Sequence, residues 1–138
     1  MKILRVYLPV VCFILFCSCE KLVETKKRDA LLEIMTSGQW HVESYIEGTI
    51  VITDQFQGFN FQFNEDGSVT GNDGLVITTG TWVGDIRNYS ISSNFPSAPD
   101  PLKKLNGTWI IKDSGLDYVA AEMKNIQGIM ILRLRKNS

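Results

Sequence analysis

Apolar and polar residues alternate along most of the chain after Gly38, which is the pattern of strands with one buried face. The clearest case is the range 59–64, where three phenylalanines share one face and three amide side chains share the other. Glu65-Asp66-Gly67 follows as a turn, in which glycine can adopt the positive φ that tight turns require. The same reasoning predicts further strands at 40–45, 50–53, 68–70, 75–83, 88–92, 108–112, 116–123 and 128–135.

One segment has helical spacing instead. In residues 26–37, Ala30, Leu31, Ile34 and Met35 form a single apolar stripe, and Gly38 provides a stop. The basic residues at its start oppose the helix dipole, so packing against the rest of the protein must hold this helix. Residues 94–104 contain three of the four prolines and predict a long loop.

The order of these elements restricts the fold. Since no second helix separates the strands, parallel βαβ units are excluded. Eight or nine short strands predict a mainly β protein, an antiparallel up-and-down barrel of about eight strands with a short N-terminal helix, because closure removes exposed strand edges. A sandwich of two sheets is the alternative.

The N-terminal pattern differs from the rest. Lys2 and Arg5 precede an apolar stretch over residues 6–17, and Ser18 precedes Cys19. The stretch is too short for a transmembrane helix of about 20 residues. The layout predicts a bacterial lipoprotein signal peptide over 1–18, with Cys19 as the lipid-bearing N-terminus, a tether over 19–25 and a domain over 26–138. An ordinary secretory signal or an uncleaved anchor is the alternative.

Cysteine and charge support an exported protein. All three cysteines lie within the first 19 residues, so the predicted domain has no disulfide. Two of the 14 basic residues would leave with the signal, so 12 would face 15 acidic ones. No nucleic-acid partner is expected from this balance. A basic cluster at 26–28 lies close enough to the anchor to touch lipid headgroups, but a solvated helix face is the favoured interpretation. We expect an outer-membrane lipoprotein of the cell envelope, with the membrane face left open.

A short motif occurs three times. Gly38-Gln39-Trp40 follows the helix and opens the first strand, and the pattern returns as Gly80-Thr81-Trp82 and Gly107-Thr108-Trp109. Together with Phe-x-Phe and the Asp66-Gly67 turn, it resembles the small lipocalin-like domains of Gram-negative lipoproteins over residues 27–136.

The resemblance implies roles for a few residues. Gly38 and Trp40 would form the barrel-closing signature, with Trp40 on the barrel floor. An arginine from the last strand, Arg133 or Arg135, would pack across the indole as a cation–π pair worth about 0.5–2 kcal/mol.

Catalytic patterns are absent from the sequence. His41 is the single histidine, and no nucleophile, phosphate-binding loop or set of metal ligands can be assembled, so we expect neither an enzyme nor a cofactor or metal. Two functions remain. One is binding of a small apolar or amphipathic ligand, with the pocket walled by Phe59, Phe61, Phe63, Trp82 and Trp109. The other is an envelope module with a filled barrel that contacts another protein, because eight strands leave room only for side chains or one small ligand.

Overall fold

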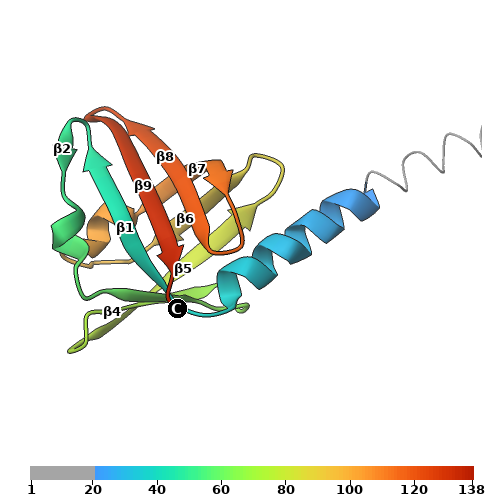
Figure 1. The fold of residues 1–138 in the computed structure, drawn as a ribbon, viewed down its shortest axis with the longest axis horizontal. Helices are drawn as coiled ribbons and strands as arrows, with labels where there is room; N and C mark the ends of the chain where they lie inside the picture. Colours follow the sequence, from blue (N-terminus) through green and yellow to red (C-terminus); the bar gives the residue numbers. More distant parts are fainter. Residues whose placement is uncertain (1–20) are drawn as a thin grey trace, which may run out of the picture.

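The computed structural model describes residues 21–138, and Figure 1 shows a β-barrel with one long helix projecting from it. The predicted signal peptide and Cys19 lie outside the described residues. The mainly β, antiparallel architecture predicted from the alternation is confirmed, and the two-sheet alternative is not the one observed.

The strands follow one another around the barrel. Each neighbouring pair is antiparallel, and the last strand pairs with the first, so eight strands close on themselves while a ninth, very short one is added to the edge of the first. The strands are β1 (Trp40–Glu47), β2 (Ile50–Val51), β3 (Asn60–Phe63), β4 (Ser68–Asn72), β5 (Ile77–Asp85), β6 (Ser90–Asn94), β7 (Gly107–Ser114), β8 (Tyr118–Asn125) and β9 (Gly128–Lys136).

The helix spans residues 21–36 and so begins five residues earlier than the predicted 26–37. Residues 21–25, expected to belong to a short tether over 19–25, are therefore helical. Leu31 packs against Gly84 of β5, and Met35 is fully buried, so only the C-terminal half of the helix joins the core. Gly38, with φ +80°, ends the helix and turns the chain into β1.

One seam of the barrel is closed differently from the others. β1 and β3 share a single register pair, Trp40 with Phe61, and diverge beyond it. The short 3-10 helix η1 (Thr53–Phe56) fills the gap. Phe56 is buried and stacks on Tyr45 with ring centroids 5.3 Å apart. This insertion seals the barrel wall where strand pairing fails.

The proline-containing loop after β6 is also part of the core. It carries a second 3-10 helix, η2 (Leu102–Leu105), and its apolar residues are almost fully buried. Leu102 packs against Gly71 of β4, and Phe95 lies edge-on to Phe61 with centroids 6.5 Å apart. The loop therefore closes the end of the barrel opposite the helix.

Candidate functional site

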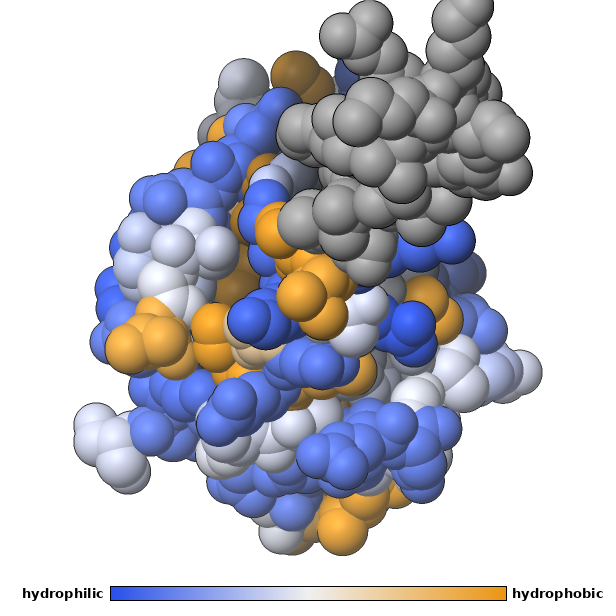
Figure 2. Space-filling model, turned by 90° about the vertical axis from the view of Figure 1, so that its right-hand side faces the viewer, coloured by the Kyte–Doolittle hydropathy of each residue, from blue (hydrophilic) through white to orange (hydrophobic). Residues whose placement is uncertain are grey.

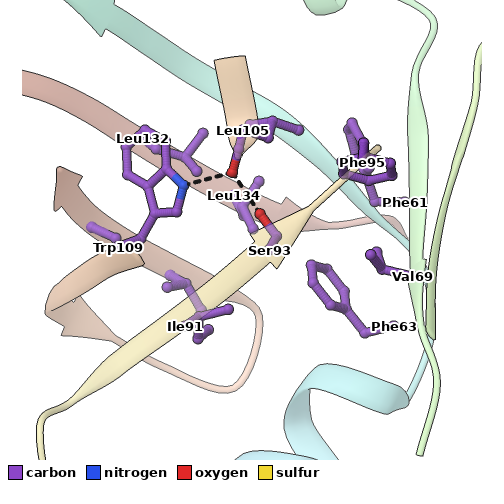
Figure 3. Close-up of a pocket in the computed structure, with 12 residues that line it drawn as sticks. Phe61, Phe63, Val69, Ile91, Ser93, Phe95, Leu105, Trp109, Leu132 and Leu134 are labelled. Atoms are coloured by element: carbon purple, nitrogen blue, oxygen red, sulfur yellow. Dashed lines mark hydrogen bonds between the residues drawn. The ribbon is translucent and has the colours of Figure 1, made fainter. Parts of the chain in front are cut away.

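The barrel interior is the place where a ligand was expected, and it is nearly filled. An apolar space of about 40 Å³ remains there, lined by Phe61, Phe63, Ile91 and Trp109 among others (Figure 3). Pockets for small organic ligands measure about 300–1,000 Å³. The residual space has room for a few water molecules at most, and apolar cavities of this kind stay dry.

The five residues predicted to wall a pocket do not all meet there. Phe61, Phe63 and Trp109 line the small cavity. Trp82 is buried but packs edge-on against Phe63, with centroids 5.3 Å apart, and fills space instead of lining it. Phe59 precedes β3 and stacks on Phe61 at 6.0 Å from a half-buried position beside η1. The predicted wall is thus divided between cavity, packed core and surface groove.

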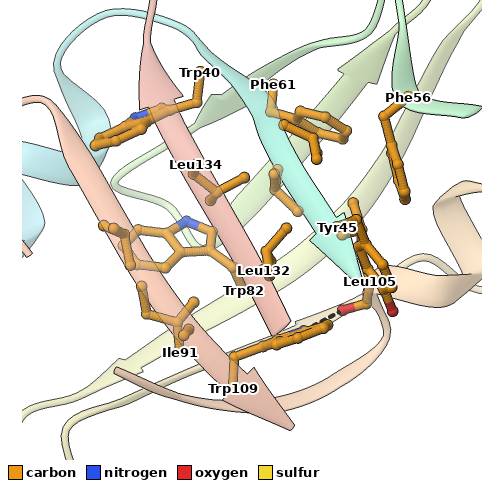
Figure 4. Packing of buried hydrophobic residues seen from close by; sticks show 14 of the residues in the cluster. Trp40, Tyr45, Phe56, Phe61, Trp82, Ile91, Leu105, Trp109, Leu132 and Leu134 are labelled. Carbon is orange, nitrogen blue, oxygen red and sulfur yellow. Dashed lines mark hydrogen bonds between the residues drawn. The ribbon is translucent and has the colours of Figure 1, made fainter. Parts of the chain in front are cut away.

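The three tryptophans of the repeated motif share one arrangement. Each is buried, and each indole N–H donates a hydrogen bond to a backbone carbonyl of another segment; Figure 4 shows the three rings and the bond from Trp109. Trp40 bonds to Met35 at the helix end at 3.0 Å, and Trp82 bonds to Asn64 beside the β3–β4 turn at 2.9 Å. Trp109 bonds to Leu105 of η2 at 2.9 Å. Sequence analysis found the motif but not these partners.

Two glycines of the motif exclude a side chain for different reasons. A Cβ at Gly80 would overlap the carbonyl oxygen of Asn94 and lie 2.9 Å from a ring carbon of Phe95, so the close approach of β6 excludes a side chain there. Gly107 has φ +127°, where a side chain is strained, and Met123 occupies the adjacent space.

The predicted arginine–indole contact is wrong. Along β9, Leu132 and Leu134 point inward, so Arg133 and Arg135 point outward. The cation above Trp40 is instead Lys136, which pairs with Trp40 in the β1–β9 register; its Nζ lies 5.1 Å from the ring centroid. The barrel-closing tryptophan is present, with a different cation across it.

Both arginines belong to a charged cluster on the outside of β1, β8 and β9. Arg133 and Arg135 lie 4.6 and 5.3 Å from the ring centroid of Tyr118, and Glu43 accepts hydrogen bonds from both. Loss of water contact acts to raise the pKa of Glu43, but the bonds from Arg135 and Arg133 outweigh it and hold the pKa below its ordinary value. Asp117 adds a second partner for Arg135 at 3.2 Å. The charges balance one another within the cluster.

Sequence analysis missed the end closure by η2. The Tyr45 hydroxyl donates to the Lys104 carbonyl at 2.8 Å, and the Lys104 ammonium pairs with Glu47 at 2.7 Å. Burial raises the pKa of Tyr45 to about 12, with smaller contributions from the carboxylates of Glu47 and Asp100. A polar cleft of about 290 Å³ lies outside this closure, beside the β8–β9 turn. The only signal in the sequence was four apolar residues within the proline-containing loop.

His41 faces outward, with Nδ1 2.6 Å from the side-chain oxygen of Asn137. Within residues 21–138, no three His, Cys, Asp or Glu side chains converge in a way that would hold a metal ion. Over the same range, no helix has both the length and the apolar character to cross a membrane.

Comparison with known proteins adds one finding. No family model matches the chain, and neither does any curated protein. Among solved structures, it is similar to the crystal structure of a DUF4847 family protein from Bacteroides vulgatus ATCC 8482. The match has 19% sequence identity and a TM-score of 0.58, and it covers 78% of this chain and 97% of that one. At this identity the likeness shows a common fold.

Proposed function

We propose that the chain is a lipid-anchored protein of the cell envelope whose barrel is a self-filled scaffold, and that it binds another envelope component through its outer surface. In this proposal it neither catalyses a reaction nor holds a cofactor. The observation that carries it is the interior: about 40 Å³ of free space inside a barrel closed at both ends.

The closure at the η2 end is what argues against a ligand. Phe95, Leu102 and Leu105, each less than 7% exposed, fill the position through which an apolar molecule would enter. To admit one, the loop would have to leave and expose these side chains to water. Burying a large apolar side chain is worth about 1.5–3 kcal/mol, so opening carries a cost that a ligand must offset.

A second candidate is binding of a small apolar ligand inside the barrel. The character of the residual cavity favours it, because Ser93 is its only polar side chain and that hydroxyl already donates to the Leu105 carbonyl (Figure 3). A cavity of this composition would attract an apolar guest if the η2 loop moved outward.

Native mass spectrometry and calorimetry of the purified protein distinguish the two candidates. We expect no co-purified molecule and no heat of binding with fatty acids, steroids or haem. Leu132→Ala, which removes an inward side chain, serves as a positive control because it enlarges the cavity. A stoichiometric apolar ligand on the unmodified protein would establish the second candidate, whereas crosslinking in cells to one envelope protein supports the first.

Attachment through Cys19 is the other part of the proposal. Its support is the signal layout in the sequence, with two early cations, a short apolar stretch and Ser18 before the cysteine. Cys19→Ala should abolish fatty-acid labelling and release the protein from the membrane fraction. Labelling that persists in this variant would disprove the assignment, and so would labelling that is absent from the unmodified protein.

A further inference from the structure

A groove follows the seam at which β1 and β3 diverge. It measures about 580 Å³, which lies within the range of small-ligand sites and far exceeds the interior space of about 40 Å³. Its lining comes from η1 and the turn after it, from the starts of β1 and β3, and from Asn137. We call it the seam groove.

The seam groove lies apart from the projecting helix. In Figure 1, η1 (green) is at the left of the barrel and the helix projects to the right. Figure 2 views the molecule from the helix side, where hydrophilic residues surround smaller hydrophobic patches. Two hollows beside the helix have linings of charged, polar and aliphatic residues, and the described residues place no aromatic ring in either. The seam groove differs from them in its aromatic base.

The base of the seam groove is apolar and fixed by the core. Val42 and Phe56 are almost fully buried there, and Phe59 is half-buried. The ring of Phe59 stacks on Phe61, with centroids 6.0 Å apart and an angle of 15° between the planes. Its backbone N–H donates to the Phe56 carbonyl at 3.1 Å, and Gly58, with φ +86°, makes the turn before it. The groove therefore contains a preformed aromatic platform.

Polar side chains beside this platform form a connected chain. The Nδ1 atom of His41 lies 2.6 Å from the Asn137 side-chain oxygen, and the Asn137 amide donates to the Asn60 oxygen at 2.7 Å. Since the Asn137 oxygen accepts, a neutral His41 donates through Nδ1 and presents Nε2 as an acceptor. The Asn60 oxygen is used in this chain, so its Nδ2 is the group that it offers to a ligand. On the η1 side, Asp54 and Gln57 add exposed polar groups.

These groups narrow the class of ligand. Among the described residues that line the groove there is one carboxylate, Asp54, and neither lysine nor arginine, so the groove does not attract an anion. Its amides and carboxylate combine donors with acceptors, which suits neighbouring hydroxyl groups that each donate one hydrogen bond and accept another. The aromatic platform, with its negative ring face, suits a surface of C–H groups. A pyranose ring presents both kinds of surface.

We propose that the seam groove binds a neutral saccharide, with the C–H face of one pyranose ring on Phe59 and its hydroxyls on Asn60, Gln57 and Asp54. This inference rests on the outer-surface binding of the proposed function and names the class of envelope component. It does not require the barrel to open, and a preformed groove lowers the cost of ordering the site.

The test uses the complete chain, purified in a detergent without a sugar headgroup. Saturation-transfer difference NMR is recorded with the neutral disaccharides cellobiose, maltose, lactose and chitobiose, and with digalacturonate as an anionic probe. We expect at least one neutral disaccharide to bind with a dissociation constant below about 5 mM, with the strongest transfer to its ring C–H protons. Absence of transfer to all the neutral probes, or tighter binding of digalacturonate, overturns the proposal.

Variants in the groove are compared with a matched variant outside it. Phe59→Leu keeps an apolar side chain without the ring, whereas Gln57→Ala and Asn60→Ala each remove an exposed amide and so test the site even if the first variant is unstable. Each should weaken binding about threefold to tenfold, as expected for one lost contact. Gln127→Ala removes an exposed amide at the β8–β9 turn and should leave binding unchanged. Unchanged binding in all the groove variants overturns the assignment of the site.

Failure of this inference is distinguishable from failure of the proposed function. A photoreactive amino acid in place of Gln57 reports, by crosslinking in cells, whether a protein occupies the seam groove. A specific protein crosslink together with absent saccharide transfer would keep the proposed function and overturn the saccharide, because the groove would then bind a polypeptide. Saccharide transfer that is lost in the groove variants supports both.

Discussion

Trp40 offers the sharpest test of how the barrel is closed. Its side chain is fully buried, its indole N–H bonds to the Met35 carbonyl at 3.0 Å, and Lys136 lies over its ring. The Met35 carbonyl is one of those that a helix end leaves without an intrahelical partner, and Met35 itself is fully buried. Trp40 therefore contributes both packing and the hydrogen bond that attaches the helix end to the barrel.

Two substitutions separate these contributions. Trp40→Phe keeps most of the apolar contact but leaves the Met35 carbonyl unpaired, which costs about 1–3 kcal/mol. Trp40→Ala also leaves a cavity, and large-to-small aromatic changes in a core cost about 3–5 kcal/mol. Lys136→Ala removes the cation together with its exposed hydrogen bond to the Ser37 hydroxyl, and should cost about 0.5–1 kcal/mol at this partly exposed site. The loss of stability should be largest for Trp40→Ala, smaller for Trp40→Phe and smallest for Lys136→Ala.

Urea unfolding at 25 °C, followed by circular dichroism and by the fluorescence of Trp82 and Trp109, measures the free energy of unfolding. The expected loss for Trp40→Ala is a large share of the 5–15 kcal/mol typical of a domain. A Trp40→Phe variant within about 0.5 kcal/mol of the parent would refute the role of the hydrogen bond. A Trp40→Ala loss no larger than that of Lys136→Ala would refute the packing argument.

Three further outcomes follow from individual contacts. Gly80→Ala should destabilise the fold by about 1–3 kcal/mol in the same unfolding assay, because backbone blocks the new Cβ, and Gly84→Ala should cost less because its Cβ meets only side chains, those of Leu31 and Trp82. The pKa of Tyr45 is raised to about 12, so the unfolded chain releases this proton first, and stability should fall as pH rises from about 10 to 12; an unchanged slope in Tyr45→Phe would contradict this. Glu43→Gln should change stability by less than about 1 kcal/mol, because its ion pairs are solvent-exposed, and a larger loss would show that the outer cluster is structural.

The alternation of side chains was sufficient to predict the barrel because its physical cause is local. A strand with one face inward needs apolar residues at every second position, and β3 and the range 130–134 of β9 follow this rule. The same rule, applied strictly to β9, places Lys136 on the side of Leu132 and Leu134. The expected arginine contact is wrong because Arg133 and Arg135 occupy the alternate, outward positions of the strand.

Other features depend on contacts that no local pattern encodes. Phe95, Leu102 and Leu105 are seven and three residues apart, which is helical spacing, but three prolines interrupt the segment, so the spacing does not show that this loop fills the barrel. The volume of the residual cavity is likewise the small difference between the volume of the barrel interior and that of the side chains inside it. This difference depends on how every side chain packs. The earlier start of the helix, by contrast, agrees with the good helix propensity of Lys21, Leu22 and Glu24.

Closure by separate segments has a kinetic consequence. The helix and η2 sit at opposite ends, and each is attached by its own indole hydrogen bond, so either end can detach while the strands stay paired. Partial openings of this kind need less free energy than complete unfolding. Amide protons of η2 and of the helix C-terminus would then exchange with solvent sooner than those at the centre of β8 and β9. The two ends of the barrel would open and close locally while the strands between them stay paired.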